Sequence, residues 1–173
     1  MLPALRLAWG VVALLALTGI AFLGLGWMFP GTWQAEASRV LPVEPAQVFP
    51  HLADVRAWDA WTPWDGLRDA AGTAATARER HWDDADVGTG SLRLIEVDPP
   101  HLVRYEVQVD GGLSTSGTLR LEPVAGGSRL TWLEAGDFGR NPLLGWFALG
   151  MPRMQANEMN KALDRLEALL QPS

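Results

Sequence analysis

Residues 7 to 29 form an uninterrupted run without a charged side chain, LAWGVVALLALTGIAFLGLGWMF. As an α-helix this run is about 34 Å long, which is enough to cross the hydrocarbon core of a bilayer. Trp9 and Trp27 lie near its two ends, where indole rings favour the headgroup regions, and a Pro-Gly pair then ends the helix. The run therefore predicts a transmembrane anchor over residues 1–30, followed by a single domain over residues 31–173.

A cleaved secretory signal is the alternative, because Ala35-Glu36-Ala37 resembles a small-x-small cleavage site. The apolar run is longer than the apolar region of a signal, usually about 7 to 15 residues, and it ends well before that site. An uncleaved anchor is therefore favoured over a cleaved signal and over a buried soluble helix. Arg6 precedes the run, and the positive-inside bias then places the domain outside the cytoplasm of a single-pass membrane protein.

The composition limits the functional classes open to the domain. The chain of 173 residues is 48% apolar with a net charge of −6, which describes a globular protein and argues against a nucleic-acid partner. The absence of cysteine removes disulfides, thiolate nucleophiles and cysteine-bound zinc together. The three histidines lie on different predicted elements without the short spacing that sets two ligands on one face, so no metal or other cofactor is expected.

Alternating apolar and polar residues predict a mostly antiparallel sheet. The clearest case is 102–109, where Val103, Tyr105 and Val107 alternate with polar neighbours, so one sheet face is apolar. Turn residues rich in Gly, Asp and Pro separate the runs and predict hairpins. The predicted strands are 33–41, 76–82, 90–97, 102–109, 114–123 and 128–135.

Two helical regions complete the predicted domain. Between the first two strands, apolar spacing of three or four predicts two short helices, divided by Pro50 and by the cap residue Asp54. At the other end, an amphipathic stripe that includes Met159 and Leu163 predicts a long C-terminal helix able to cover the apolar sheet face. The fold class is therefore α+β in one domain.

This order of elements resembles the START-related helix-grip superfamily (SRPBCC), in its bacterial polyketide cyclase/dehydrase-like branch. The resemblance covers residues 33–170 and is carried by VEPAQVFPHLADVRAWDAWTPWD, GTGSLRLIEVDPPHLVRYEV and SGTLRLEPVAGGSRLTWLEAGD. It implies a curved antiparallel sheet of about six strands wrapped around the C-terminal helix. It also implies an apolar cavity for lipids, polyketides or similar molecules, and an N-terminal membrane helix in some bacterial members.

In such a fold, inward strand residues and the inner helix face would line the cavity. Plain core burial is the competing interpretation for each of these residues. Arg104 and Glu134 are the polar groups that could enter the cavity, and no residue is singled out as catalytic. The apolar cavity candidates are Trp64, Trp82, Tyr105, Val107, Trp132, Trp146, Met154 and Met159.

Trp58, Trp61 and Trp64 are spaced by three in DVRAWDAWTPWDG. The spacing places Trp58 and Trp61 near one helical face as structural plugs of the sheet, whereas Thr62-Pro63 turns the chain so that Trp64 can contact a ligand. The favoured function is a membrane-anchored domain that binds a hydrophobic small molecule or lipid. The alternatives are a polyketide cyclase/dehydrase-like enzyme, and a non-enzymatic protein-interaction module of the cell envelope.

Overall fold

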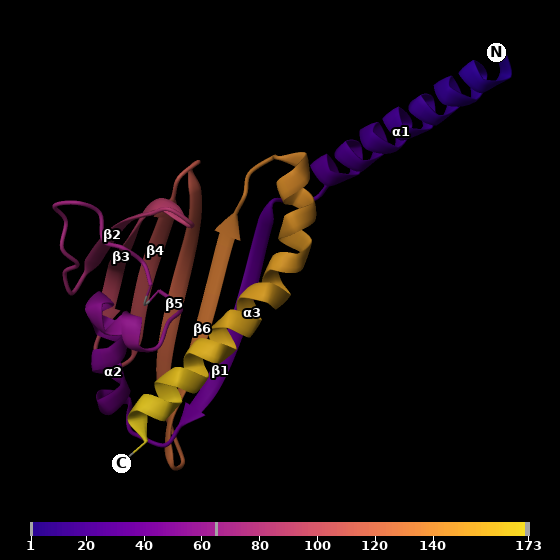
Figure 1. The fold of residues 1–173 in the computed structure, drawn as a ribbon. Helices are drawn as coiled ribbons and strands as arrows, with labels where there is room; N and C mark the ends of the chain where they lie inside the picture. The colour runs from indigo at the N-terminus through magenta and orange to yellow at the C-terminus, as the bar shows by residue number, and fades with distance from the viewer. Residues whose placement is uncertain (1, 65, 172–173) are drawn as a thin grey trace.

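The computed structural model describes residues 2–64 and 66–171, which form one long helical extension and one α+β domain (Figure 1). The domain is a six-stranded antiparallel sheet in the order β1-β6-β5-β4-β3-β2, with the long helix α3 lying across one face. The predicted helix-grip architecture is therefore confirmed. The elements are α1 Leu2–Met28, β1 Thr32–Leu41, α2 Pro45–Ala53, the 3-10 helix η1 Val55–Ala60, β2 Glu79–Asp84, β3 Gly88–Asp98, β4 Leu102–Val109, β5 Leu113–Val124, β6 Gly127–Asp137 and α3 Pro142–Leu170.

Tight turns connect the consecutive strands from β2 to β6, and one non-local pairing completes the sheet. Gly111 and Gly112 connect β4 to β5 with positive φ angles of 86° and 77°, which glycine adopts without steric cost. β1 has no hairpin partner and pairs along its whole length with β6, from Thr32 opposite Asp137 to Leu41 opposite Ser128. The first and last strands of the domain are therefore neighbours.

Most strand ends differ from the prediction by one or two residues, and two predicted boundaries differ more. Pro50 lies inside α2 and does not divide it. Proline has no N–H to donate to the Ala46 carbonyl, but both residues lie on the exposed side of the helix, where that carbonyl faces solvent. The break comes at Asp54, whose side chain accepts from the Arg56 backbone N–H and begins η1. β2 begins later than predicted, because the Thr76 hydroxyl accepts backbone N–H bonds and forms a turn there.

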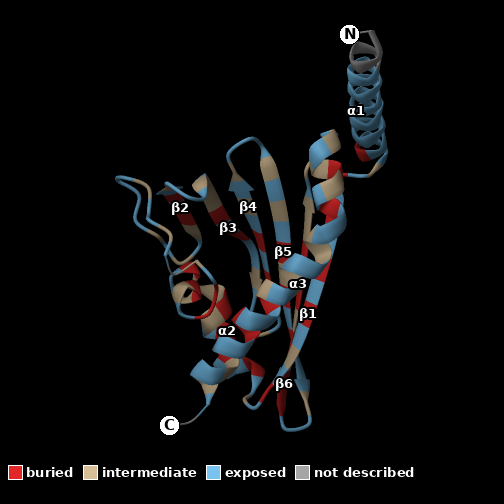
Figure 2. Ribbon diagram, turned by 45° about the vertical axis from the view of Figure 1, so that its right-hand side comes forward, coloured by how far each residue is buried: buried red, intermediate tan, exposed pale blue. Residues whose placement is uncertain are grey.

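The core lies between the inner sheet face and α3 (Figure 2). Strand alternation places residues such as Val103, Tyr105 and Leu119 inward, while their neighbours along each strand face solvent. The inner stripe of α3 contributes Met159, Ala162, Leu163 and Leu166, all buried. The helix continues through Gly150 and Pro152 as one element, Pro142–Leu170.

α1 projects away from the domain and is exposed along most of its length (Figures 1 and 2). Within the described residues, Leu7–Met28 is the one segment long and apolar enough to cross a membrane, with a mean hydropathy of 2.2. Such a helix is equally compatible with a transmembrane anchor and with an N-terminal signal sequence by length and composition.

Candidate functional site

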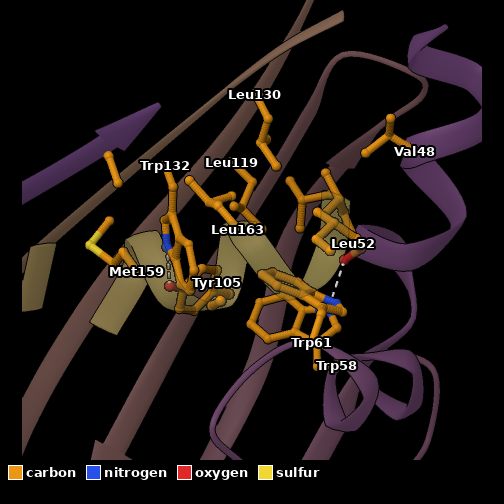
Figure 3. Close-up of a cluster of buried hydrophobic side chains, with 14 of the residues drawn as sticks. Val48, Leu52, Trp58, Trp61, Tyr105, Leu119, Leu130, Trp132, Met159 and Leu163 are labelled. Carbon is orange, nitrogen blue, oxygen red and sulfur yellow. Dashed lines mark hydrogen bonds between the residues drawn. The ribbon is translucent and has the colours of Figure 1, made fainter. Parts of the chain in front are cut away.

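A buried polar cluster lies between the sheet and α3. The Tyr105 hydroxyl on β4 donates a hydrogen bond to Glu134 Oε1 on β6, and the Gln155 side chain on α3 donates to Glu134 Oε2. Trp132 Nε1 donates to the Tyr105 oxygen at 2.7 Å (Figure 3). Glu134 is 3% exposed and Tyr105 is 0% exposed. An ionisable group is thus held by two direct donors, Tyr105 and Gln155, in an otherwise apolar interior.

The surroundings of this cluster change its acid–base properties. Burial raises the pKa of Glu134 above its ordinary value, although the hydrogen bonds from Tyr105 and Gln155 act in the opposite direction. Burial and the neighbouring Glu134 carboxyl raise the pKa of the Tyr105 hydroxyl well above its ordinary value. The cluster therefore combines a carboxyl group that gains protons more readily with a phenol that remains neutral and donates a hydrogen bond.

A glycine on the adjacent strand makes room for the Tyr105 ring. Gly117 on β5 is paired directly opposite Tyr105, and a Cβ atom at Gly117 would lie 1.9 Å from Tyr105 Cζ. The same arrangement recurs where Trp82 covers Gly90 and where Trp33 covers Gly136, each pair again directly opposite in register. Three inward aromatic rings therefore lie flat against the neighbouring strand of the sheet, because the opposite residue has no side chain.

The three tryptophans of the DVRAWDAWTPWDG segment close one end of the core. Trp58 and Trp61 are fully buried, and their rings contact Tyr105 and Trp132 at centroid distances of 4.9 Å and 5.5 Å (Figure 3). Their indole N–H groups donate to the carbonyl groups of Leu52 and His51 at the end of α2. Trp64 is half-buried and stacks on Trp58 at 5.6 Å. This segment thus forms a wall directly beside the polar cluster.

Arg80 anchors the loop that follows these tryptophans. Its buried guanidinium forms ion pairs with Asp59 and Asp69, at 2.5 Å and 2.7 Å, and donates to the carbonyl groups of Trp64 and Leu67. The Arg80 side chain is therefore fully engaged with the loop, and does not enter the polar cluster.

Apart from Trp64, which stacks on Trp58, the structure divides the predicted site residues into two groups. Tyr105, Trp132 and Glu134 are brought into contact, Met159 lies in the same buried cluster, and Trp82 is buried farther along the sheet. Val107, two positions after Tyr105 on the same strand face, is half-buried against the core.

The second group lies outside the interior, contrary to expectation. Arg104 is on the outer sheet face and forms an ion pair with Glu96, because residues 104 and 105 of one strand face opposite sides. Met154 on α3 is 47% exposed. Trp146 lies against α1, where its ring stacks on Phe22 at 4.9 Å.

Sequence reasoning missed Gln155, the α3 member of the cluster. Gln155 precedes Met159 by one helical turn, so a search for polar residues along the buried stripe of α3 would have found it. Among the described residues, no group of three or more His, Cys, Asp or Glu side chains is arranged to hold a metal ion. The polar cluster itself supplies a carboxyl, a phenol and an amide.

Open grooves also occur on the outer side of the sheet. One groove of about 530 Å³ is lined in part by Gln34, Glu106 and Ser116, and a second of about 440 Å³ by His81, Ser91 and Gln108 among others. These residues alternate with inward ones along their strands, so both grooves lie on the outer face. Neither groove includes a residue of the polar cluster.

Comparisons with known proteins agree with this fold. Residues 32–171 match the family model described as polyketide cyclase / dehydrase and lipid transport. A Chromobacterium violaceum protein superposes with a TM-score of 0.59 at 21% identity, covering 81% of this chain and 98% of its own. A Rhodobacter sphaeroides protein gives 0.56 at 25% identity, covering 83% and 94%. DynU16, a protein of the dynemicin biosynthetic locus, gives 0.56 at 16% identity, covering 79% of this chain and 46% of its own. No curated protein matches the sequence.

Proposed function

Because the chain belongs to the polyketide cyclase / dehydrase and lipid transport family, we propose that it is a membrane-anchored protein that binds a hydrophobic small molecule or lipid between the sheet and α3. The observation that carries this proposal is the buried cluster of Tyr105, Glu134 and Gln155. Sites for apolar ligands combine a mostly apolar lining with a few convergent polar groups that fix orientation. A buried carboxyl with a shifted pKa is typical of such a site.

The end of the sheet nearest α1 carries apolar side chains that are not fully buried. Val107 and Val109 on β4, Phe138 after β6 and Met151 on α3 are half-buried apolar side chains that pack against the core. Met151 is unbranched and adapts readily to a new neighbour. We infer that an apolar ligand enters between these side chains and directs its polar group toward Glu134 and Gln155.

The anchor completes the proposal. α1 would hold the domain at the membrane, with the domain outside the cytoplasm as the charge at Arg6 indicates. Tethering would keep the binding site near the bilayer, where hydrophobic molecules are concentrated. A ligand taken from the membrane would then reach the binding site without passing through the aqueous phase on its own.

A matched pair of substitutions tests the site. The full chain, purified in detergent, is titrated with the fluorescent fatty acid cis-parinaric acid, and co-purified lipids are identified by mass spectrometry. Val107→Trp fills the inner face above Tyr105, and Gln108→Trp places the same side chain on the outer face of the same strand. We expect Val107→Trp to weaken binding at least about tenfold, corresponding to about 1.4 kcal/mol, and Gln108→Trp to bind like the wild type. Equal binding by both variants, or none by the wild type, would contradict the proposal.

A cyclase-like enzyme is the second candidate, and the contact between Tyr105 and Glu134 favours it. A carboxyl group with a raised pKa beside a neutral phenol can supply and accept protons during an enol or dehydration step. The co-purified ligand distinguishes the two candidates. Conversion of that compound by the wild type and not by Glu134→Gln would identify an enzyme, whereas unchanged recovery from both would identify a binding protein.

A further inference from the structure

The end of α1 and the start of α3 form a close helix–helix contact. A Cβ atom on Gly145 would lie 2.2 Å from the Gly26 carbonyl oxygen, so the two backbones touch only because both residues are glycine. Trp146 lies against Phe22 and Phe29 at 4.9 Å and 4.8 Å, and its indole N–H donates to the Phe22 carbonyl at 3.0 Å. The position of α3 relative to the apolar helix is therefore fixed.

This contact sets the depth of α3 if α1 crosses a bilayer. The apolar span Leu7–Met28 has 22 residues, about 33 Å of helix for a hydrocarbon core about 30 Å thick. Phe22 lies about 9 Å along the helix from the end of that span. Withdrawing Phe22 from the bilayer would leave about 22 Å of helix inside, which is too short to cross it. The residue that contacts Phe22 must therefore lie near membrane depth as well.

The surface of α3 fits that position. Residues 142–152 contain no charged side chain, and Arg140 and Arg153 flank them. Leu143 and Phe147 expose 58% and 49% of their surface. In water such exposed apolar side chains are unfavourable, whereas at a bilayer they gain apolar surroundings and the flanking arginines can reach the headgroups.

An apolar groove runs between the two helices at the same level. It has a volume of about 480 Å³ and is lined by Ile20, Leu23, Gly24, Trp27 and Pro142. Four of these residues belong to the apolar span of α1, so the groove opens toward hydrocarbon when α1 is in the membrane. A phospholipid acyl chain has the chemistry of this lining, and no polar side chain competes for it.

We propose that the first part of α3, residues 142–152, is seated in the membrane beside α1, with a phospholipid acyl chain in the groove between them. This inference rests on the proposed membrane anchor. It adds a second membrane contact that belongs to the domain itself, and it brings the half-buried side chains Phe138 and Met151 to the bilayer surface.

The cysteine-free chain makes a depth measurement simple. Single variants Phe147→Cys, Leu143→Cys, Val12→Cys and Asn160→Cys are labelled with the environment-sensitive dye NBD and reconstituted as full chains in phosphatidylcholine vesicles. Quenching by 5-doxyl and 12-doxyl phosphatidylcholine reports contact with lipid. Val12 tests the anchor, and the exposed Asn160, about 20 Å farther along α3 than Phe147, is the matched control.

We expect the labels at Phe147 and Leu143 to lose most of their emission to the shallow 5-doxyl quencher, and the label at Asn160 to keep its emission. Two labelled positions on α3 are used so that a folding defect in one does not decide the result. Quenching at Val12 with none at Phe147 and Leu143 would overturn this inference and leave the anchor standing. No quenching at Val12 would overturn the anchor and this inference together.

Discussion

Glu134 is a carboxyl group placed in an apolar interior and satisfied there by two side-chain donors, Tyr105 and Gln155. Removing one partner of such a cluster leaves a buried polar group unpaired, which is more costly than never having had the pair. The three side chains come from β4, β6 and α3, so their two hydrogen bonds connect the middle of the sheet to the helix. At the scale of the residue, the proposed binding role and the stability of the fold therefore both depend on Glu134.

The raised pKa of Glu134 makes a prediction about stability and pH. The folded chain holds the Glu134 proton more tightly than the unfolded chain, whose carboxyl has the ordinary value of 4.5. The contribution of Glu134 to stability is therefore fully present below that value and is lost as the pH rises through the raised folded pKa. Glu134→Gln is neutral at every pH and lacks this loss.

Urea unfolding of both proteins from pH 3.5 to 8 measures the effect. We expect the free energy of unfolding of Glu134→Gln relative to the wild type to be constant at the acid end. Above pH 4.5 it should increase in favour of the variant, by up to about 1.4 kcal/mol for each unit by which the folded pKa is raised. Parallel pH profiles for the two proteins would contradict the shift.

At the scale of the element, the sheet is organised by pairs of an aromatic residue and a glycine on adjacent strands. Tyr105 with Gly117, Trp82 with Gly90, and Trp33 with Gly136 occur on three different strand pairs. Glycine weakens an isolated strand, but here its missing side chain is the space that the ring occupies. The position of Tyr105, and through it the hydrogen bond to Glu134, depends on Gly117.

Gly117→Ala tests this dependence. Its Cβ atom would meet the Tyr105 ring at 1.9 Å, and overfilling a core of this kind costs about 1–3 kcal/mol. We expect a loss of stability in that range by urea unfolding, together with altered near-ultraviolet circular dichroism from the displaced ring. Ser116→Ala, the adjacent position on the outer face, should stay within about 0.5 kcal/mol of the wild type. A Gly117→Ala protein as stable as the wild type would show that the ring moves aside freely.

At the scale of the whole molecule, the apolar helix and the domain are joined by β1. Ala35 and Ala37, the candidate cleavage residues, are buried in the middle of β1 and pair with Glu134 and Trp132 of β6. Cleavage after Ala37 would remove Trp33 and both alanines from the core and would unpair the β1-facing edge of β6 beside the polar cluster, although β5 still pairs with its other edge. This arrangement, with the contact between Trp146 and α1, supports the uncleaved anchor.

An intact-mass measurement on protein from the membrane fraction checks this point. We expect the mature protein to retain α1 and the whole of β1, because the folded domain needs residues from Thr32 onward. The same mass should be found in Ala37→Leu, which disables the cleavage motif. A wild-type product beginning at Ser38 that is absent from Ala37→Leu would show that the segment is a cleaved signal.

Local pattern determined much of this protein. Each pattern that predicted an element depends only on neighbours a few positions away. Examples are the uncharged run of residues 7–29, the alternation of residues 102–109 and the amphipathic stripe in the second half of α3. The elements and their order could therefore be predicted from the sequence alone. Two predicted boundaries were wrong. Pro50 does not divide its helix, and the Thr76 hydroxyl forms a turn where a strand was predicted.

The tertiary structure decided which of these residues meet. Arg104 and Tyr105 are adjacent in sequence, yet only Tyr105 reaches the interior. Glu134 lies 29 positions from Tyr105, and their contact depends on the register of β4, β5 and β6. Gln155 joins them because of the way α3 lies on the sheet, and Trp146 contacts α1 because two glycines let the helices touch. Such long-range contacts depend on strand register and helix placement together, which no local pattern encodes.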